Sequence, residues 1–225
     1  LMLGTNVSEV DPVAHEIVLG NDQRIGYRKL IWAAGGDASR LSLPGGDLAG
    51  IHTVRHRADV EVMKEELLAG ARRAVVIGAG FIGLEAAAVL RKLGCDVTVI
   101  EMQDRVLARV GGTQLGDFYA QEHREHGVDL RLSTGISAIE GTAGRISAVI
   151  TDDGEATPCY IMVVGIGIVP SVGPLIAAGA AGSNGVDVDE FCRTSLDDIY
   201  AIGVCAAPAA SAARWLFDTI SSTVC

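Results

Sequence analysis

The sequence is poor in positive charge and contains no long apolar run. Of its 225 residues, 18 are Lys or Arg and 28 are Asp or Glu, which gives a formal net charge of −10. A chain of that sign repels phosphate backbones and anionic lipid headgroups, so we expect neither nucleic acid nor a membrane as a partner. No apolar run approaches the roughly 20 residues that span a bilayer. The 49% of hydrophobic residues still provides for a sizeable core.

The cysteines and histidines lack the spacings of disulfide frameworks and metal sites. The five cysteines include no C-x-x-C or C-x4-C pair: Cys95, Cys159, Cys192, Cys205 and Cys225. An odd, unpaired set predicts reduced thiols and a cytoplasmic protein. His123 and His126 fall on a polar helix face, where solvation is more common than metal binding. No Ser/His/Asp, Cys/His or paired-carboxylate constellation is found either, so we expect no catalytic side chain and no metal.

Residues 74–101 contain the series of elements that binds a dinucleotide. The β-branched run Val75–Ile77 predicts a buried strand, and glycines in G-x-G-x-x-G spacing follow it at once. An apolar helix then runs to Leu93, and a second strand, Val97–Ile100, ends at an acidic residue. A strand before the glycines and a helix after them favour nucleotide binding over a glycine-rich turn of another α/β protein.

Each glycine of this motif has a separate physical role. Gly78 permits the tight turn, Gly80 lets the backbone approach a pyrophosphate, and Gly83 lets the helix pack closely on the strand. The helix N-terminus offers N–H groups and a partial positive charge to the phosphates. Glu101 follows Gly78 by 23 positions, where a carboxylate accepts the ribose 2′-hydroxyl and repels a 2′-phosphate. We therefore predict NAD rather than NADP.

Two segments, residues 7–36 and 135–167, share one plan. Each has a short antiparallel meander and then a buried strand that runs into glycine, Leu30–Ala34 in the first copy and Tyr160–Val164 in the second. A complete strand–helix unit precedes the second copy, whereas nothing precedes the first. We therefore expect that a matching upstream unit has been lost, the alternative being that the first meander is a small accessory sheet.

Alternating strands and helices predict the fold class. Amphipathic patterns over Arg57–Leu68 and Gln114–His126 indicate helices, and the first of these presents Val60, Met63 and Leu67 on one face. Strands that alternate with helices form a parallel, doubly wound sheet. The sequence thus predicts an α/β protein with a Rossmann-like domain and an added antiparallel meander.

Five motifs in a fixed order resemble a known family. They are YRKLIWAAGG at 27–36, VVIGAGFIGLEAAAVL at 75–90, VIEMQDRVLAR at 99–109, VVGIGIVPSVGPL at 163–175 and GVDVDEFCRTSLDDIYAIGVCA at 185–206. Together they resemble the FAD- and NAD-dependent pyridine nucleotide oxidoreductases, in particular the ferredoxin (rubredoxin and putidaredoxin) reductase branch. The resemblance implies an NAD domain at 46–168, inserted in a partial FAD domain of the same type. That FAD domain would comprise residues 1–45 and 169–225, with an unmatched tail and truncation at both ends.

The resemblance also implies the cofactor-binding residues. The NAD pyrophosphate and its surroundings would be held by Gly78, Gly80, Phe81, Ile82 and Gly83. Glu101 would hold the adenosine ribose, Arg109 would lie on the adenine side, and Glu85 would lie near the nicotinamide. A first-turn acid favoured by the helix dipole is the alternative for Glu85. The loop that flanks the nicotinamide would be Gly165, Ile166 and Gly167. The positions facing FAD would be Ala34, Gly35, Gly203 and Val204.

The implied function is electron transfer from NADH through FAD to a small iron–sulfur carrier, a ferredoxin or a rubredoxin. Hydride passes directly between the cofactors, which agrees with the lack of a catalytic side chain. The family usually has threonine at Ala34 and aspartate at Val204, and neither alanine nor valine can form a side-chain hydrogen bond. The alternative is therefore a non-catalytic NAD-binding fragment that cannot hold FAD, so that FAD belongs to the full-length parent.

Overall fold

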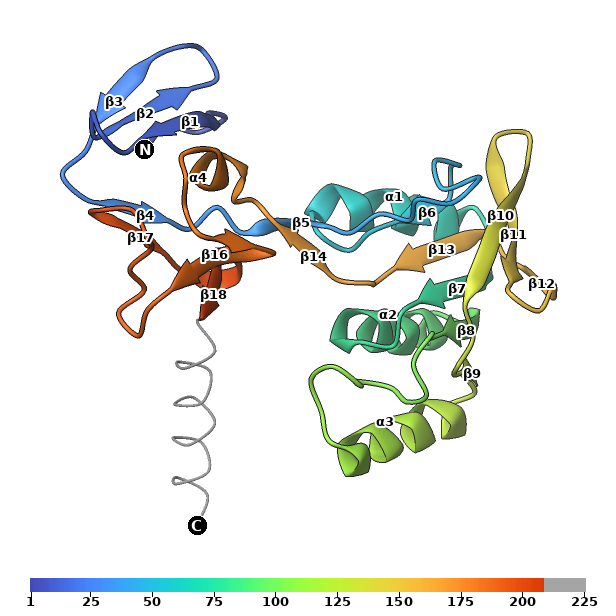
Figure 1. Ribbon diagram of the computed structural model, residues 1–225. Coiled ribbons are helices and arrows are strands. Elements are labelled where there is room, and N and C mark those ends of the chain that lie inside the picture. Colours follow the sequence, from blue (N-terminus) through green and yellow to red (C-terminus); the bar gives the residue numbers. More distant parts are fainter. Residues whose placement is uncertain (209–225) are drawn as a thin grey trace. The chain divides into compact units, whose positions relative to one another are not determined.

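The computed structural model describes residues 1–208 and divides into two compact units (Figure 1). The central unit is Ala38–Ile168, and the other consists of Leu1–Asp37 together with the chain from Val169 onward. The central unit begins before the predicted border at residue 46, because Pro44 is bound to the meander that follows the parallel sheet: the Ile139 N–H donates to the Pro44 carbonyl at 3.1 Å. The predicted unmatched tail, Arg214–Cys225, lies outside the described residues.

A five-stranded parallel sheet forms the centre of the unit Ala38–Ile168. Its order is β6 (Ile51–His52), β13 (Ile161–Val164), β7 (Arg73–Ile77), β8 (Asp96–Ile100) and β9 (Asp129–Arg131). Every neighbouring pair in this sheet is parallel. The predicted α/β class with a parallel sheet is confirmed.

Different elements cover the two faces of this sheet. The helices are α1 (Arg57–Leu68), α2 (Phe81–Lys92) and α3 (Thr113–Glu125), and the antiparallel meander is β10 (Ile136–Thr142), β11 (Arg145–Thr151) and β12 (Ala156–Pro158). Successive side chains of a strand point to opposite faces. Accordingly, Val76 packs in one cluster with Ala87 of α2, whereas Val75 packs in another with Val149 of the meander. Strand β7 is therefore buried on both faces, which fixes the turn that follows it.

Helix α1 is held partly by charge. Met63 and Leu67 pack against the core as predicted, but Val60 is 44% exposed, so its predicted place on the apolar face is wrong. The Glu66 carboxylate instead bridges two elements: Oε2 lies 2.7 Å from His52 Nε2, and Oε1 lies 2.5 Å from Arg145 Nη2. Because α1 lies next to the short edge strand β6, it meets too little of the sheet to bury a full helical face.

His123 is only partly exposed, and both of its ring nitrogens lie near backbone carbonyl oxygens. Its Nε2 lies 3.0 Å from the Leu84 carbonyl oxygen of α2, and its Nδ1 lies 2.9 Å from the Tyr119 carbonyl oxygen. His126 remains exposed, with Nδ1 2.7 Å from the Glu122 carbonyl oxygen. His123 therefore links α3 to the helix that follows the glycine turn.

The second unit, which combines Leu1–Asp37 with the chain from Val169 onward, also has a meander followed by a parallel strand. Its meander is β1 (Val7–Asp11), β2 (Glu16–Leu19) and β3 (Arg24–Gly26), and β4 (Leu30–Trp32) then pairs in parallel with β17 (Ile199–Ala201). The remaining elements are α4 (Gly173–Ala177), β15 (Gly182–Ser183), β16 (Gly185–Val188), a 3-10 turn (Gly203–Cys205) and β18 (Ala206–Pro208). The two connecting strands, β5 (Gly36–Ala38) and β14 (Ile168–Pro170), pair with each other. The predicted repeat of pattern is confirmed.

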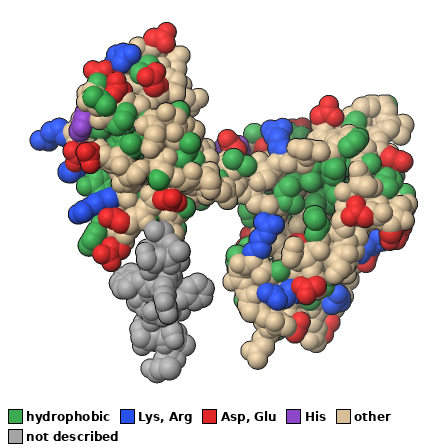
Figure 2. Space-filling view, viewed as in Figure 1, with side chains coloured by type: hydrophobic (Ala, Val, Ile, Leu, Met, Phe, Trp, Pro, Cys, Tyr) green, Lys and Arg blue, Asp and Glu red, His purple; other side chains and the backbone are tan. Residues whose placement is uncertain are grey.

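Charged side chains of both signs are interspersed on the visible face, with apolar side chains between them (Figure 2). No helix within residues 1–208 is long and apolar enough to cross a bilayer. Cys95, Cys159 and Cys205 are buried as free thiols and Cys192 is partly exposed, while Cys225 lies outside the described residues.

Candidate nucleotide-binding site

A cavity of about 740 Å³ opens where β7, β8 and β13 end. Ligands of open parallel sheets bind at this carboxyl edge. The predicted site residues that line the cavity are Gly78, Gly80, Phe81, Ile82, Glu101, Arg109, Gly165, Ile166 and Gly167. They come from stretches up to 89 positions apart, and the parallel strands bring them to one edge. All belong to the unit Ala38–Ile168.

The three glycines of the turn differ in what surrounds them. Gly78 has a φ of +96°, and a Cβ there would lie 2.6 Å from the Gly165 carbonyl oxygen. A Cβ on Gly83 would lie 1.9 Å from the Gly78 carbonyl oxygen, so this residue is a close contact between helix and strand. A Cβ on Gly80 would meet no atom within 4 Å. The chain itself therefore requires glycine at 78 and 83, whereas position 80 faces open space in the cavity.

Glu101 reaches across the end of β8 to the glycine turn. Its Oε2 accepts a hydrogen bond from the Ala79 N–H at 2.7 Å, and its Oε1 accepts one from the Gln103 N–H at 2.9 Å. A carboxylate has about four lone-pair sites, so both oxygens can accept further hydrogen bonds. The carboxylate is thus held in the cavity wall with acceptor capacity left for a ligand.

The loop after Glu101 forms the next wall. The Leu107 N–H donates to the Ala79 carbonyl at 3.0 Å, and Leu107 has a φ of +54°, uncommon for a non-glycine residue. Val106 and Leu107 are buried, so the middle of the loop packs against the core of the unit. Met102, Arg109 and Val110 are exposed around it and line the cavity.

The loop after β13 closes the opposite side. The Gly165 N–H donates to the Ile77 carbonyl at 2.8 Å, which holds this loop against the glycine turn. Gly167 has a φ of +121°, a conformation that favours glycine. Ile166 and Ile168 extend the apolar lining of the cavity.

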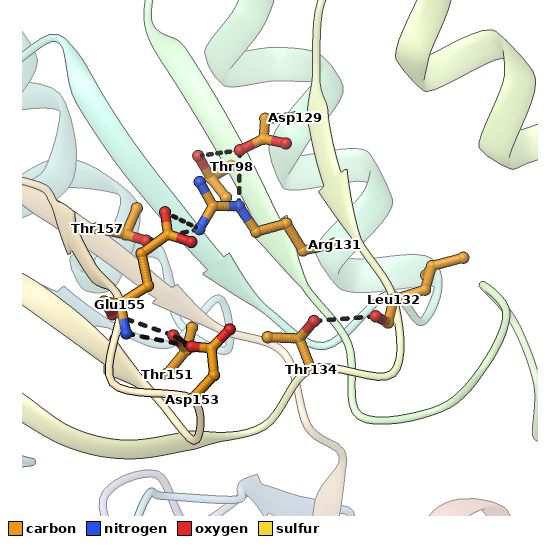
Figure 3. A network of polar contacts seen from close by, with 9 residues as sticks. All are labelled: Thr98, Asp129, Arg131, Leu132, Thr134, Thr151, Asp153, Glu155 and Thr157. Atoms are coloured by element: carbon orange, nitrogen blue, oxygen red, sulfur yellow. Dashed lines mark hydrogen bonds and ion pairs between the residues drawn. The ribbon is translucent and has the colours of Figure 1, made fainter.

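Polar contacts of Arg131 lie near Thr134, which lines the cavity (Figure 3). Arg131 of β9 donates through Nε to Asp129 at 2.9 Å and through Nη1 to Glu155 at 2.9 Å, which ties the edge of the sheet to the meander. Burial opposes the charge of Arg131, but its hydrogen bonds to the two carboxylates outweigh burial and raise its pKa. The Thr134 hydroxyl donates to the Leu132 carbonyl at 2.9 Å just below this network.

The positions predicted to face FAD meet in the other unit. Because β4 and β17 pair in parallel, the turns after them lie side by side. Gly35 has a φ of +67° and Gly203 one of +66°, and the Cys205 thiol donates to the Gly35 carbonyl at 3.1 Å. Ala34 and Val204 complete these turns, and Val204 is 46% exposed.

Two of the residues predicted at the NAD site do not line the cavity. Gly83 is buried behind the turn, where it sets the packing of α2. Glu85 is exposed on α2. Conversely, the sequence did not point to three lining residues that lie outside the glycine motif, Leu41, Ser42 and Leu43. The Pro44-Gly45-Gly46 stretch that follows them indicates a turn and no ligand.

Comparisons with known proteins agree with this geometry. The family model described as pyridine nucleotide-disulphide oxidoreductase matches residues 1–221. The 5,5′-dehydrodivanillate O-demethylase ferredoxin reductase subunit of Sphingobium sp. is 53% identical over 208 residues, 92% of this chain and 50% of that protein. A ferredoxin–NAD(P)(+) reductase of Sphingomonas sp. is 47% identical, over 91% of this chain and 49% of its own length.

Solved structures of similar reductases have the same fold. The ferredoxin reductase for the CYP199A2 system of Rhodopseudomonas palustris superimposes with a TM-score of 0.87 at 32% identity, covering 92% of this chain and 51% of that one. Putidaredoxin reductase in its covalent complex with putidaredoxin gives 0.86 at 32% identity, with the same coverage. The chain spans about half the length of the curated relatives it matches.

Proposed function

Since this chain belongs to the pyridine nucleotide-disulphide oxidoreductase family, we propose that it binds NADH at the carboxyl edge of β7, β8 and β13 and is part of a flavoenzyme of the ferredoxin reductase type. The family resemblance predicted from the five motifs is confirmed. This family uses FAD and NAD(P)H, and similar proteins include a ferredoxin–NAD(P)(+) reductase and a rubredoxin–NAD(+) reductase.

One observation carries the proposal: the open space at Gly80 and the carboxylate of Glu101 lie in the same cavity. A pyrophosphate needs close backbone approach at the second glycine, and a ribose needs an acceptor at the end of the next strand. Position 80 offers the open space, and Glu101 offers the acceptor. The residues present therefore fit NAD.

The order of the strands gives the orientation of the dinucleotide. Glu101 would hold the adenosine ribose over β8, and the glycine turn would hold the pyrophosphate over β7. The nicotinamide half would then extend over β13, which lies on the far side of β7 from β8. Phe81 and Ile82, in the first turn of α2, supply N-terminal N–H groups and the helix dipole to the phosphates.

The chemistry at this site is binding and orientation. Bound NADH would supply a hydride from its nicotinamide. The apolar side chains of Ile166 and Ile168 would exclude water from that end of the cavity. Arg109, exposed on the loop after β8, would lie against the adenine side.

The turns predicted to face FAD fit a flavin less well. Of their side chains, those of Ala34 and Val204 can neither donate nor accept a hydrogen bond. A non-catalytic NADH-binding piece of such an enzyme is the second candidate, and the apolar character of Val204 favours it.

Two measurements on the purified full chain separate these candidates. Isothermal titration with NADH tests the shared nucleotide site, and an NADH-dependent dye reduction assay with added FAD tests for a flavoenzyme. A yellow protein that reduces the dye and passes electrons to a ferredoxin or rubredoxin supports the first candidate. A colourless protein that binds NADH but reduces no dye supports the second. Failure to bind NADH contradicts both.

A further inference from the structure

A short segment outside the glycine motif forms part of the cavity wall. We call residues 41–43 the strap, since they cross the carboxyl edge of the sheet before the first parallel strand begins. All three, Leu41, Ser42 and Leu43, line the cavity together with residues of the glycine turn and the loop after β13. The strap belongs to the same compact unit, Ala38–Ile168.

The strap is held in place by a turn with little freedom. The Gly46 N–H donates to the Leu43 carbonyl at 3.0 Å, and the Ile139 N–H of β10 donates to the Pro44 carbonyl at 3.1 Å. Gly45 has a φ of +82°, and a Cβ there would lie 2.2 Å from the Ile139 carbonyl oxygen. These contacts fix the strap to the meander, so its residues keep a defined position in the cavity wall.

The strap lies near one particular half of the dinucleotide. The Ser39 N–H, just before it, donates to the Gly167 carbonyl at 3.0 Å, so the chain enters the strap beside the loop after β13. Adenosine lies at the other end, where Glu101 and the loop after it provide the wall. The nicotinamide half, which extends over β13, is the part of the ligand within reach of the strap.

Resting on the proposed binding of NADH, we propose that the strap seats the nicotinamide end and that Leu43 is its specificity-determining residue. Leu41 is partly buried against the core of the meander, whereas Leu43 belongs to no core cluster of the described residues. Leu43 is half-buried and has apolar surface left in the cavity wall. Its apolar side chain lines the cavity together with Ile166 and Ile168.

The test compares two ligands that share only the adenosine and pyrophosphate. NADH and ADP are titrated calorimetrically into the full chain and its Leu43→Ala variant. We expect the Kd of NADH to rise roughly tenfold, as for the loss of an apolar contact in a binding pocket, and the Kd of ADP to stay unchanged. Leu43→Val, a smaller truncation, should give a smaller rise in the same direction.

The matched control is Leu68→Ala, which truncates a leucine that is 80% exposed at the end of α1, away from the cavity. It should leave both constants unchanged. Equal weakening of NADH and ADP by Leu43→Ala, or no change in either, would overturn the assignment of the strap to nicotinamide. If the wild-type chain binds neither ligand, the proposed function itself fails, and this outcome is distinct from a failure of the strap alone.

Discussion

Adding one methyl group at Gly83 should destabilise the fold, whereas the same change at Gly80 should abolish ligand binding and leave the fold intact. At Gly83 the new Cβ would lie 1.9 Å from the Gly78 carbonyl oxygen and 3.3 Å from Val76 Cγ1. The obstacle is backbone and cannot rotate away, so α2 must shift from β7. Overpacking of this kind costs about 1–3 kcal/mol, and the better helix propensity of alanine returns about 1 kcal/mol.

We take the upper end of the overpacking range because the contact is with backbone, which leaves a net loss of about 2 kcal/mol and a fall in Tm of roughly 4–8 °C. Gly80 has a φ of −78°, which alanine adopts freely, and its loss as N-cap costs below about 1 kcal/mol. Thermal unfolding followed by circular dichroism measures the first effect, and NADH titration measures the second. An unchanged Tm in Gly83→Ala, or wild-type NADH affinity in Gly80→Ala, would refute these roles.

Two further predictions follow from the contacts of single side chains. The Glu101→Gln substitution puts an NH2 group against the N–H of Ala79 or Gln103. Since a hydrogen bond to a charged group contributes about 1.5–3 kcal/mol, the Kd of NADH should rise by about 10- to 100-fold. The Kd of NADPH should rise by less, because the lost charge no longer repels its 2′-phosphate. Paired titrations check this, and an unchanged NADH-to-NADPH ratio would contradict it. Burial raises the pKa of the Cys159 thiol from about 9 to about 12, so above pH 9 the unfolded state loses a proton that the native state keeps, and the free energy of unfolding falls as pH rises. Urea unfolding at pH 8, 9 and 10 should show a shallower fall for Cys159→Ala, and equal slopes would count against the buried thiol.

The nucleotide fold follows from local pattern. Three strands of the central sheet, β7, β8 and β13, are short, mainly apolar runs followed by glycine or an acid, and the glycine spacing indicates the turn geometry directly. Gly83 is required by a contact five residues away and Gly78 by its positive φ, so the spacing of the motif alone was sufficient to predict both. The repeated meander could be predicted for the same reason, since alternation and turn residues define it.

What could not be predicted depends on contacts between distant residues. The strap carries no motif, and only the fold places Leu43 beside a loop that follows it by more than 120 positions. Val60 follows the helical period, but α1 meets too little of the sheet to cover it. His123 has a polar neighbourhood in the sequence, and its contact with the Leu84 carbonyl exists only because α3 packs beside α2.

The central claim is that this chain binds NADH through the turn at Gly78–Gly83. Calorimetric titration of NADH into the wild-type chain and Gly80→Val tests it most directly, because valine fills the open space at position 80 while its neighbours remain in place. We predict saturable binding at one site per chain, lost in the variant, with the circular dichroism spectra unchanged. Equal binding by both proteins, or no binding by the wild type, would contradict the account.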